Sequence, residues 1–340
     1  MSHALIVLPD DTAQPILDAI DGAKKSLRVK MFLFSDPALL AAVTNAKRRG
    51  VKVQVMLNPT RRDGQAENKA TIRKLKAAKI EVLDSNPEFD VTHEKSMVVD
   101  GDTAFVKSLN WVTRNLTETR DYAVVTTHSA EVDEIIECFE ADWNRKPFPA
   151  SEHPRLIWCT INGRDRIAQF IDEAKHSLFV QNERYQDSVI IERLVRAKVR
   201  GVKIHVLAKP VHTLKLDKLI EGVGGLRIMD DVGIKIRLLK HLKLHGKMLL
   251  ADDSRAVVGS INLTPGSFDS RRELAIEVHA ADVVERLSKI ARHDWKHSHP
   301  MDLSDEGLRD EFETHQLAVA TEKLALSKKK DKNKKRKHLK

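Results

Sequence analysis

The N-terminal part of the chain alternates between helix-like and strand-like spacing of its apolar residues. Apolar side chains recur every three or four positions over residues 16–23, which predicts an amphipathic helix. The next apolar run, 27–34, suits a buried strand. A second helix is predicted over 39–48, because Gly50, a residue type favoured just past helix ends, follows it. Residues 51–56 then alternate between apolar and polar side chains, as a half-buried strand does.

This pattern returns in the second half of the chain. Residues 19–29 and 170–180 match at seven of eleven positions, at an offset of 151. Further on the offset becomes 152, which one inserted residue explains. Self-similarity of this kind indicates a repeated structural unit. We therefore expect two copies of one domain in tandem, over 1–150 and 151–301, each ending in an amphipathic helix.

Each copy alternates strands with helices of ordinary length, which is typical of an α/β fold and favours a largely parallel sheet. The stretch 302–327 has no counterpart in the first copy, and we expect a C-terminal helical appendage there. The last residues, 328–340, hold nine Lys or Arg and one acid. Such a run repels itself and cannot bury a core, so we expect a disordered basic tail.

Composition limits the class of protein. Hydrophobic residues make up 41% of the 340 residues, as in globular proteins, and no apolar run reaches the roughly 18 residues of a membrane-spanning helix. Much of the net charge of +9 lies in the tail, which suits contact with nucleic acid or anionic lipid, or a purely solubilising role. Two cysteines are too few for a disulfide framework, and the N-terminus does not resemble a secretory signal, so we expect a cytoplasmic protein.

Polar residues repeat between the copies as closely as apolar ones do. Each copy contains a His-x-Lys-x4-Asp motif, then a Ser and an Asn two positions apart, and then an acid. These pairs, all at an offset of 152, are His93/His245, Lys95/Lys247, Asp100/Asp252, Ser108/Ser260, Asn110/Asn262 and Asp121/Glu273.

One such motif alone would be weak evidence, because each of these residue types often has a structural role. Repetition changes that judgement, since a core repeats apolar positions but has no reason to keep polar groups that need buried partners. The flanking apolar residues predict strands. Residues two apart on a strand share a face, so each His and Lys, and each Ser and Asn, is expected to project into one cavity.

These residues resemble the paired HKD motifs of the phospholipase D superfamily, and the resemblance covers residues 1–300 or so. It implies that the two copies form a pseudo-dimer with one shared active site, which needs no oligomer, no metal and no cofactor. It also implies an enzyme, a phosphoric diester hydrolase or phosphatidyltransferase. One histidine attacks phosphorus and becomes phosphorylated, the other protonates the leaving alkoxide, and water or an alcohol resolves the intermediate.

The resemblance implies a role for each member of the motifs. His93 would be the nucleophile and His245 the general acid, although the symmetry of the motifs leaves this order open. The two lysines and two asparagines would hold the phosphate oxygens, while Asp121 and Glu273 would orient the imidazole rings. Structural roles would fall to the remaining four, Asp100, Asp252, Ser108 and Ser260. A phosphodiester anion needs such neutralisation, and histidine titrates near neutral pH, so the chemistry agrees.

Two further features do not fit the repeat. Lys107 stands where the family pattern has glycine, which the second copy keeps as Gly259. We expect Lys107 either to alter the rim of the cleft or to weaken the approach of the backbone to the phosphate, without removing a catalytic group. His293, His297 and His299 have a spacing that metal sites use, but no carboxylate or cysteine set accompanies them. A solvated helix end is the expected account of these histidines.

The two intact motifs most resemble the bacterial phospholipase D and cardiolipin synthase-like branch. The expected substrate is a phospholipid headgroup at a membrane surface, on the inner face, reached through the tail or the segment 210–245. Products would be phosphatidic acid, with water as acceptor, or a cardiolipin-type lipid. Aromatics are only 5% of the residues, few for stacking single-stranded nucleic acid. A metal-independent nuclease, or a non-catalytic basic-tailed protein that binds nucleic acid or membranes, remain alternatives.

Overall fold

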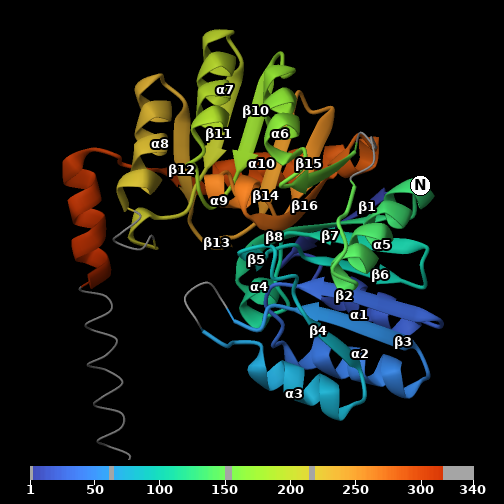
Figure 1. Cartoon of the computed structure of the whole chain (residues 1–340). Helices are drawn as coiled ribbons and strands as arrows, with labels where there is room; N and C mark the ends of the chain where they lie inside the picture. Colours follow the sequence, from blue (N-terminus) through green and yellow to red (C-terminus); the bar gives the residue numbers. More distant parts are fainter. Residues whose placement is uncertain (1–2, 61–64, 150–154, 214–218, 317–340) are drawn as a thin grey trace, which may run out of the picture.

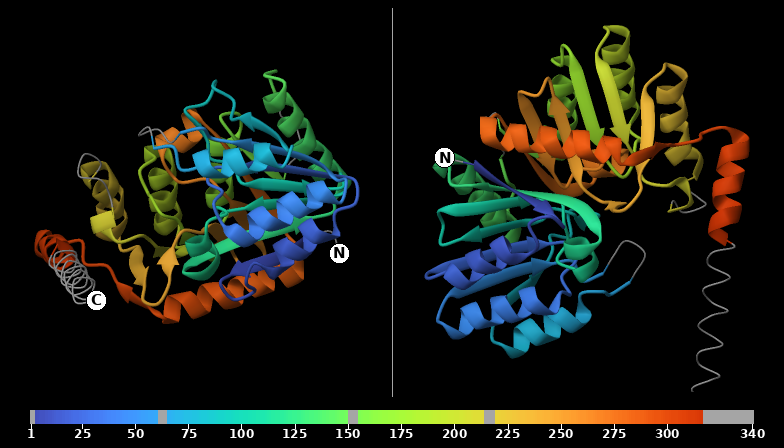
Figure 2. Two further views of the ribbon diagram at one scale, coloured as in Figure 1. Left: turned by 90° about the horizontal axis from the view of Figure 1, so that it is seen from below. Right: turned by 180° about the vertical axis from the view of Figure 1, so that it is seen from behind.

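The computed structural model of this chain describes residues 3–60, 65–149, 155–213 and 219–316. The predicted basic tail at 328–340 lies outside the described residues. The two copies form two stacked halves, the blue-to-green half and the half coloured from yellow-green to orange (Figure 1). Two further views show the same arrangement, with the long helix α10 lying along the junction of the halves (Figure 2).

The first copy contains the helices and strands that its apolar pattern predicts. The helices predicted over 16–23 and 39–48 are confirmed as α1 and α2, and Gly50 adopts the left-handed backbone, φ 94°, that often ends a helix. Its elements are β1 (His3–Leu8), α1 (Gln14–Gly22), β2 (Ser26–Met31), α2 (Pro37–Arg48), β3 (Lys52–Leu57), α3 (Lys69–Ala77), β4 (Glu81–Asp84), β5 (Val91–Thr92), β6 (Ser96–Val99), β7 (Thr103–Lys107), α4 (Thr113–Thr117), β8 (Thr119–Thr126) and α5 (Ser129–Trp143).

The second copy repeats this order. Of the predicted appendage, a helix over 305–316 is described. The elements of the second copy are β9 (Leu156–Cys159), α6 (Gly163–Asp172), β10 (Ser177–Gln181), α7 (Ser188–Val199), β11 (Lys203–Leu207), the 3₁₀ turn η1 (Val211–Thr213), α8 (Leu219–Asp231), β12 (Lys235–Leu239), β13 (Lys243–Leu244), β14 (Lys247–Ala251), β15 (Arg255–Gly259), α9 (Pro265–Asp269), β16 (Arg271–Val278), α10 (Ala281–Lys296) and β17 (Ser298–Pro300).

Each copy builds one mixed sheet. The strand orders are β1-β8-β7-β6-β2-β3-β4 in the first sheet and β17-β12-β11-β10-β14-β15-β16-β5 in the second. Only β2-β3-β4 and β10-β11-β12 run parallel within their own copies. The prediction of a largely parallel sheet was therefore wrong. The reason is local: β6 and β7 are joined by a short turn at Asp100-Gly101, and strands joined so tightly must run antiparallel.

Two very short strands pair across the copies. Val91 of β5 lies opposite Arg271 of β16, and Lys243 of β13 lies opposite Thr119 of β8. Each short strand directly precedes a motif histidine. The exchange therefore delivers each histidine to the sheet of the opposite copy.

The two copies also share a core. One cluster of buried apolar side chains combines residues of both sheets, among them Val98 and Val124 of the first copy and Met248 and Leu274 of the second. Removing this apolar surface from water favours one joined body over two separate domains. Apolar packing therefore holds together the interface to which the motif histidines are delivered.

Candidate active site

The two motif histidines are each held by a carboxylate of the other copy. Nδ1 of His93 lies 2.8 Å from Oε2 of Glu273, and Nδ1 of His245 lies 2.8 Å from Oδ1 of Asp121. An ionised carboxylate only accepts hydrogen bonds, so Nδ1 donates and the other ring nitrogen, Nε2, is free for chemistry. The structure thus places Asp121 and Glu273 where ring-orienting groups are needed, and each acts across the interface.

Both motif lysines are buried beside the histidines. Nζ of Lys95 donates to the carbonyl oxygen of His93 at 2.5 Å, and Nζ of Lys247 donates to that of His245. Burial and then Lys247 lower the pKa of Lys95 to about 7. Two positive charges buried close together repel each other. An anion bound between them would therefore be favourable.

The environment of His93 favours the neutral imidazole. Burial lowers its pKa most, and Lys95 and Lys247 add to this against the opposing effect of Glu273, so that the pKa falls to about 3. The contacts of His93 with Glu273, and of His245 with Asp121 and Asn110, bring both motifs to one site. A neutral ring with a free Nε2 is the form in which histidine is a nucleophile.

Ser108 and Asn110 contact the Asp121 carboxylate and the His245 ring, whereas Ser260 bonds to the backbone of Leu274. Oγ of Ser108 donates to Oδ1 of Asp121 at 2.6 Å, whereas Oγ of Ser260 donates to the Leu274 carbonyl at 3.2 Å. Nδ2 of Asn110 lies 3.5 Å from Nε2 of His245. The side-chain oxygens of Asn110 and Asn262 are buried without a hydrogen-bond partner among the described residues.

The motifs lie only partly on strands. The apolar stretches 97–99 and 248–251 are confirmed as strand, within β6 and β14, and Lys247 begins β14. His93, Lys95 and His245 lie in the connections before β6 and β14, and the Ser and Asn residues follow the ends of β7 and β15. For these residues the prediction was wrong, because the chain has to leave its pairing with the other copy before it joins its own sheet. The polar groups of the motifs lie in this connection between the two sheets.

The motif aspartates hold a loop of their own copy. The carboxylate of Asp100 accepts from the backbone N–H groups of residues 24–26 at 2.6–3.1 Å, and that of Asp252 accepts from those of 175–177 at 2.7–2.9 Å. Burial alone would raise both pKa values, but these bonds hold them below the ordinary value. The bonds lie away from the histidines and fix the start of β2 and of β10.

Lys107 does not lie at the cleft rim, contrary to expectation. Its side chain is buried, Nζ has no hydrogen-bond partner among the described residues, and it lies 5.2 Å from the centroid of the Trp111 ring. Burial, aided by Lys95, lowers its pKa well below the ordinary value. In the second copy a side chain cannot fit, because a Cβ on Gly259 would meet Ala275 and Leu274 at 2.4 Å.

The sequence analysis missed one acid in the site. The side chain of Glu183, just after β10, is 12% exposed and accepts hydrogen bonds from Nζ of Lys247 and from Nζ of Lys209, both at 2.6 Å. Its Oε2 lies 3.8 Å from Nε2 of His245. Burial would raise the pKa of Glu183, but Lys247, His245 and Lys209 hold it well below its ordinary value.

Glu183 escaped detection because it does not repeat. The residue at the same place in the first copy is Phe32, whose ring lies edge-on to His93 at 5.0 Å and 5.4 Å from Nζ of Lys95. A search for polar residues at equivalent positions does not find such a pair, because only one of the two residues is polar. The two halves of the site are therefore chemically different, apolar beside His93 and charged beside His245.

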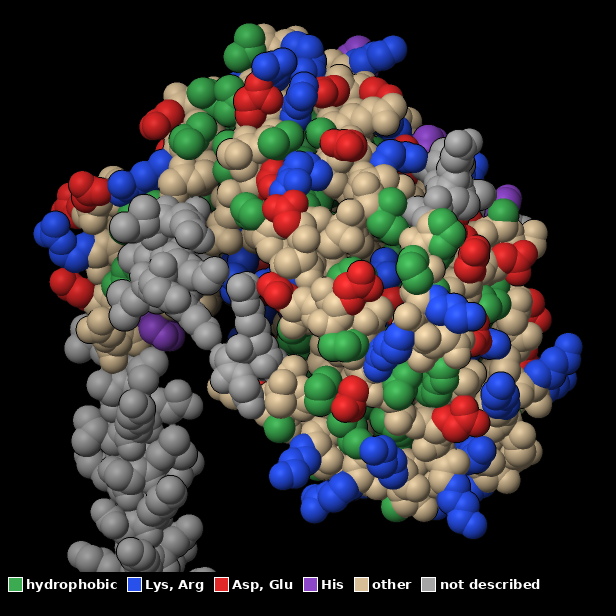
Figure 3. All heavy atoms as spheres, in the orientation of Figure 1, with side chains coloured by type: hydrophobic (Ala, Val, Ile, Leu, Met, Phe, Trp, Pro, Cys, Tyr) green, Lys and Arg blue, Asp and Glu red, His purple; other side chains and the backbone are tan. Residues whose placement is uncertain are grey.

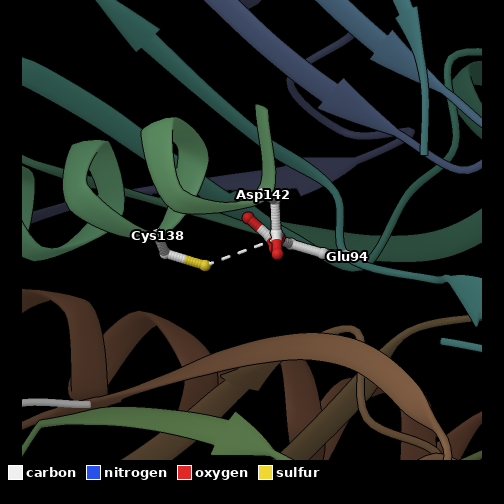
Figure 4. A group of neighbouring side chains, drawn as sticks. All are labelled: Glu94, Cys138 and Asp142. Atoms are coloured by element: carbon white, nitrogen blue, oxygen red, sulfur yellow. Dashed lines mark hydrogen bonds between the residues drawn. The ribbon is translucent and has the colours of Figure 1, made fainter. Parts of the chain in front are cut away.

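A second polar cluster lies apart from the histidines. Glu94, Cys138 and Asp142 bring potential metal-ligand atoms within 4.8 Å of one another (Figure 4). However, Nζ of Lys30 donates to Glu94 at 2.9 Å and to Asp142 at 2.8 Å, and it lies 3.5 Å from Sγ of Cys138. Arg272 also donates to Asp142, at 2.9 and 3.0 Å. Two cations therefore already neutralise the two carboxylates, so we assign this cluster no metal.

The three histidines whose spacing resembles that of metal sites lie at the end of α10 and on β17. His293 and His297 are exposed at the end of α10, with ring centroids 4.2 Å apart, and Nδ1 of His297 lies 2.9 Å from the His293 carbonyl oxygen. His299 is exposed on β17. Among the described residues, none of the three belongs to a group with metal-site geometry.

Comparison with known proteins points to one family. The family model described as "Cardiolipin synthase, PLD-like domain" matches the chain twice, over residues 16–143 and 167–295. Cardiolipin synthase 1 of Bacillus anthracis is 22% identical, over 86% of this chain and 66% of that protein. The chain thus spans just under two thirds of that relative. Cardiolipin synthase B of Salmonella typhi is 26% identical, over 78% of this chain and 73% of that protein.

A solved structure shares the fold. The crystal structure of phosphatidylserine synthase from Haemophilus influenzae Rd KW20 matches with a TM-score of 0.68 and 11% sequence identity, over 94% of both chains. At that identity the match concerns the arrangement of the chain alone. It extends over both copies of this protein.

Proposed function

The chain belongs to the PLD-like domain family of the phospholipase D superfamily, and on that premise we propose that it is a phosphatidyltransferase of the cardiolipin synthase type. The observation that carries the proposal is the pair of imidazoles, His93 and His245, each oriented by a carboxylate of the opposite copy. Two buried lysines beside them supply the positive charge that a phosphodiester anion needs. The relatives named cardiolipin synthase favour a phospholipid as the source of that anion.

In the first step, Nε2 of neutral His93 attacks the phosphorus of the phospholipid. The N–P bond forms as the P–O bond to the headgroup alcohol breaks, and protonated His245 gives its Nε2 proton to the departing oxygen. Lys95 and Lys247, with the side-chain amides of Asn110 and Asn262, hold the non-bridging oxygens. The incoming anion lies between the two ammonium groups and favours the charged form of both.

In the second step, the hydroxyl oxygen of an acceptor attacks the same phosphorus. The N–P bond breaks, the acceptor's proton passes to Nε2 of His245, and His93 is left neutral as before. Water as acceptor gives phosphatidic acid, whereas an alcohol gives a new phosphodiester. We propose an alcohol as the main acceptor, because the curated relatives named above are synthases.

We place the reaction at a membrane surface, where phospholipids are found. Within the described part of the chain, no helix combines the length and the apolar character needed to cross a bilayer. We propose that surface side chains make the contact with the membrane.

The test is a product analysis by mass spectrometry. The purified chain is incubated, in the presence of a chelator, with vesicles of phosphatidylcholine, phosphatidylethanolamine and phosphatidylglycerol. We expect cardiolipin, with less phosphatidic acid. His93→Ala and His245→Ala should each lower the rate by at least a thousandfold, since each removes a group that forms or breaks a bond. His293→Ala removes an exposed histidine of α10 and should leave the rate unchanged.

Other products in this assay would indicate a different function. Phosphatidic acid alone would make the protein a hydrolase that uses water. If neither lipid appears, the lipid assignment fails and a nucleic-acid phosphodiester becomes the substrate to test. Loss of activity in chelator that added metal restores would contradict the mechanism.

A further inference from the structure

A pocket of about 730 Å³ opens beside His245, at the junction of the two copies. Its walls come from α4 of the first copy and from two loops of the second, 208–213 and 239–245. His245 itself forms one end of the pocket. A group bound there would therefore reach the histidine that exchanges a proton with the headgroup or the acceptor.

Basic residues are the largest chemical group in the lining of the pocket. Four lysine or arginine side chains face one acid, Glu118, and two histidines add to the basic set. The basic lining residues are Arg114, Lys209, Lys240, Lys243, His212 and His241.

Part of this charge is uncompensated. Lys243 pairs with Glu118 at 2.8 Å, and Lys209 pairs with Glu183 at 2.6 Å. Arg114 and Lys240 are exposed, and neither has an ion pair with a described carboxylate. An anion in the pocket would therefore meet two positive charges that form no ion pair, of which Arg114 also acts on Glu118 at longer range.

The corresponding place beside His93 has a different character. The repeat offset relates Lys243 to Val91, a correspondence that the two exchanged strands fix, since these residues occupy equivalent positions in β13 and β5. Four of the other basic residues have neutral or acidic counterparts: Arg114 corresponds to Gly266, Lys209 to Asn58, Lys240 to Glu88 and His241 to Phe89, whereas His212 corresponds to Arg61. At these four positions the basic side chains belong to the His245 side.

We propose that this pocket binds the phosphate of a second, anionic phospholipid that acts as the acceptor. The inference rests on the proposed function, and it adds where the acceptor lies and what charge it carries. With its phosphate beside Arg114 and Lys240, the acceptor would direct a headgroup hydroxyl toward the phosphorus held by His93. Nε2 of His245, at the end of the pocket, would take the proton of that hydroxyl.

The charge of the pocket gives the acceptor its selectivity. A basic residue near an anionic lipid contributes on the order of 1 kcal/mol. Losing two such contacts should therefore slow transfer to an anionic acceptor by roughly tenfold or more. Transfer to an uncharged alcohol gains nothing from the pocket and should not change.

Product partition measures this selectivity. Phosphatidylglycerol vesicles with 1-butanol in the buffer offer the same covalent intermediate an anionic acceptor, an uncharged acceptor and water. The products are cardiolipin, phosphatidylbutanol and phosphatidic acid, measured by mass spectrometry. Because all three arise from one intermediate, the ratio of cardiolipin to phosphatidylbutanol depends only on the acceptor step.

The test variant is the double substitution Arg114→Gln with Lys240→Gln, and the matched control is Glu88→Gln at the counterpart of Lys240. We expect the ratio of cardiolipin to phosphatidylbutanol to fall at least tenfold in the double variant and to stay unchanged in the control. An unchanged ratio in the double variant, whether total turnover falls or not, would overturn the inference. If the wild type forms phosphatidylbutanol without cardiolipin, the inference fails while the transferase mechanism stands. If it forms none of the three products, the proposed function itself fails.

Discussion

At the scale of single residues, Glu183 separates the chemistry of two otherwise similar motifs. It places a carboxylate 3.8 Å from Nε2 of His245, whereas the first copy places Phe32 beside His93. An anion at that distance favours the protonated ring, which is the form that a general acid needs. The asymmetry supports the order of roles proposed above, with His93 as nucleophile.

Glu183→Gln should move the alkaline limb of the kcat/KM profile to lower pH. The carboxylate opposes the lowering of the pKa of Lys95, which burial and Lys247 bring to about 7. Without it Lys95 loses its proton at lower pH, so we expect a shift of about one pH unit. A pH series of initial rates measures it, and Glu183→Asp should restore most of the wild-type profile. A uniform loss of rate at every pH would assign Glu183 a structural role.

We expect buried Lys107 to lower the free energy of unfolding near neutral pH. Its pKa is depressed in the folded protein, so between that value and about 10.4, its value in the unfolded chain, the unfolded state binds more protons. The contribution of Lys107 to the free energy of unfolding therefore rises with pH between these two pKa values. Lys107→Met keeps the contact with Trp111 and removes the unpaired amine, which should stabilise the fold by about 1–3 kcal/mol at pH 7.

Urea denaturation at pH 7 and pH 9.5 checks this expectation. The gain from Lys107→Met should shrink at the higher pH, because removing the proton of the wild-type lysine on folding then costs less free energy. Lys52→Met, at an exposed position of β3, is the control. An equal gain at both pH values would show that burial of the charge is not the cause.

At the scale of elements, α3 has the charge of a membrane-contact helix. Lys and Arg side chains gather on the lower face of the first copy, with few acids among them (Figure 3). The nine residues of α3 include no acid, and its basic residues, Lys69, Arg73, Lys74 and Lys76, are exposed. We expect replacement of all four by Gln to weaken binding to phosphatidylglycerol vesicles at least tenfold.

Vesicle sedimentation at low and at high salt measures that effect. The control replaces Arg193 and Arg196 of α7, which pair with Asp172 and Glu192 and so have less charge to offer. Loss of binding in the control as well would indicate a general effect of net charge. Unchanged binding in the α3 variant would leave the membrane contact to other surfaces.

The elements also show how far the sequence could predict this fold. Helices α1, α2 and α5 were predictable because their periodicity is local, and the repeat indicated two copies. Strands β5 and β13 were not, since two residues carry no periodicity and their partners lie about 180 and 124 residues away in the chain. The polar residues of the motifs were predictable because they repeat. Glu183 and the basic pocket were not, because they occur in one copy only.

At the scale of the whole molecule, two buried ion pairs cross the interface beside the shared core. Asp142 of the first copy accepts from Arg272 of the second at 2.9 and 3.0 Å, and Asp294 of the second accepts from Arg120 of the first at the same distances. The repeat offset relates these pairs to each other. Because Arg120 and Arg272 adjoin the ring-orienting acids Asp121 and Glu273, the same contacts join the copies and position the site.

Asp294→Asn should therefore destabilise the molecule as a single unit. It leaves Arg120, which is 3% exposed, without its buried carboxylate, a change that typically costs about 3–5 kcal/mol. The shared core couples the copies, so calorimetry should show one transition in the wild type and one, at lower temperature, in the variant. Asp305→Asn breaks the exposed pair with Arg227 and should change little, because solvent screens such pairs. Two separate transitions in either protein would mean that the copies unfold independently, and the active site between them would then depend on a weaker interface than these contacts imply.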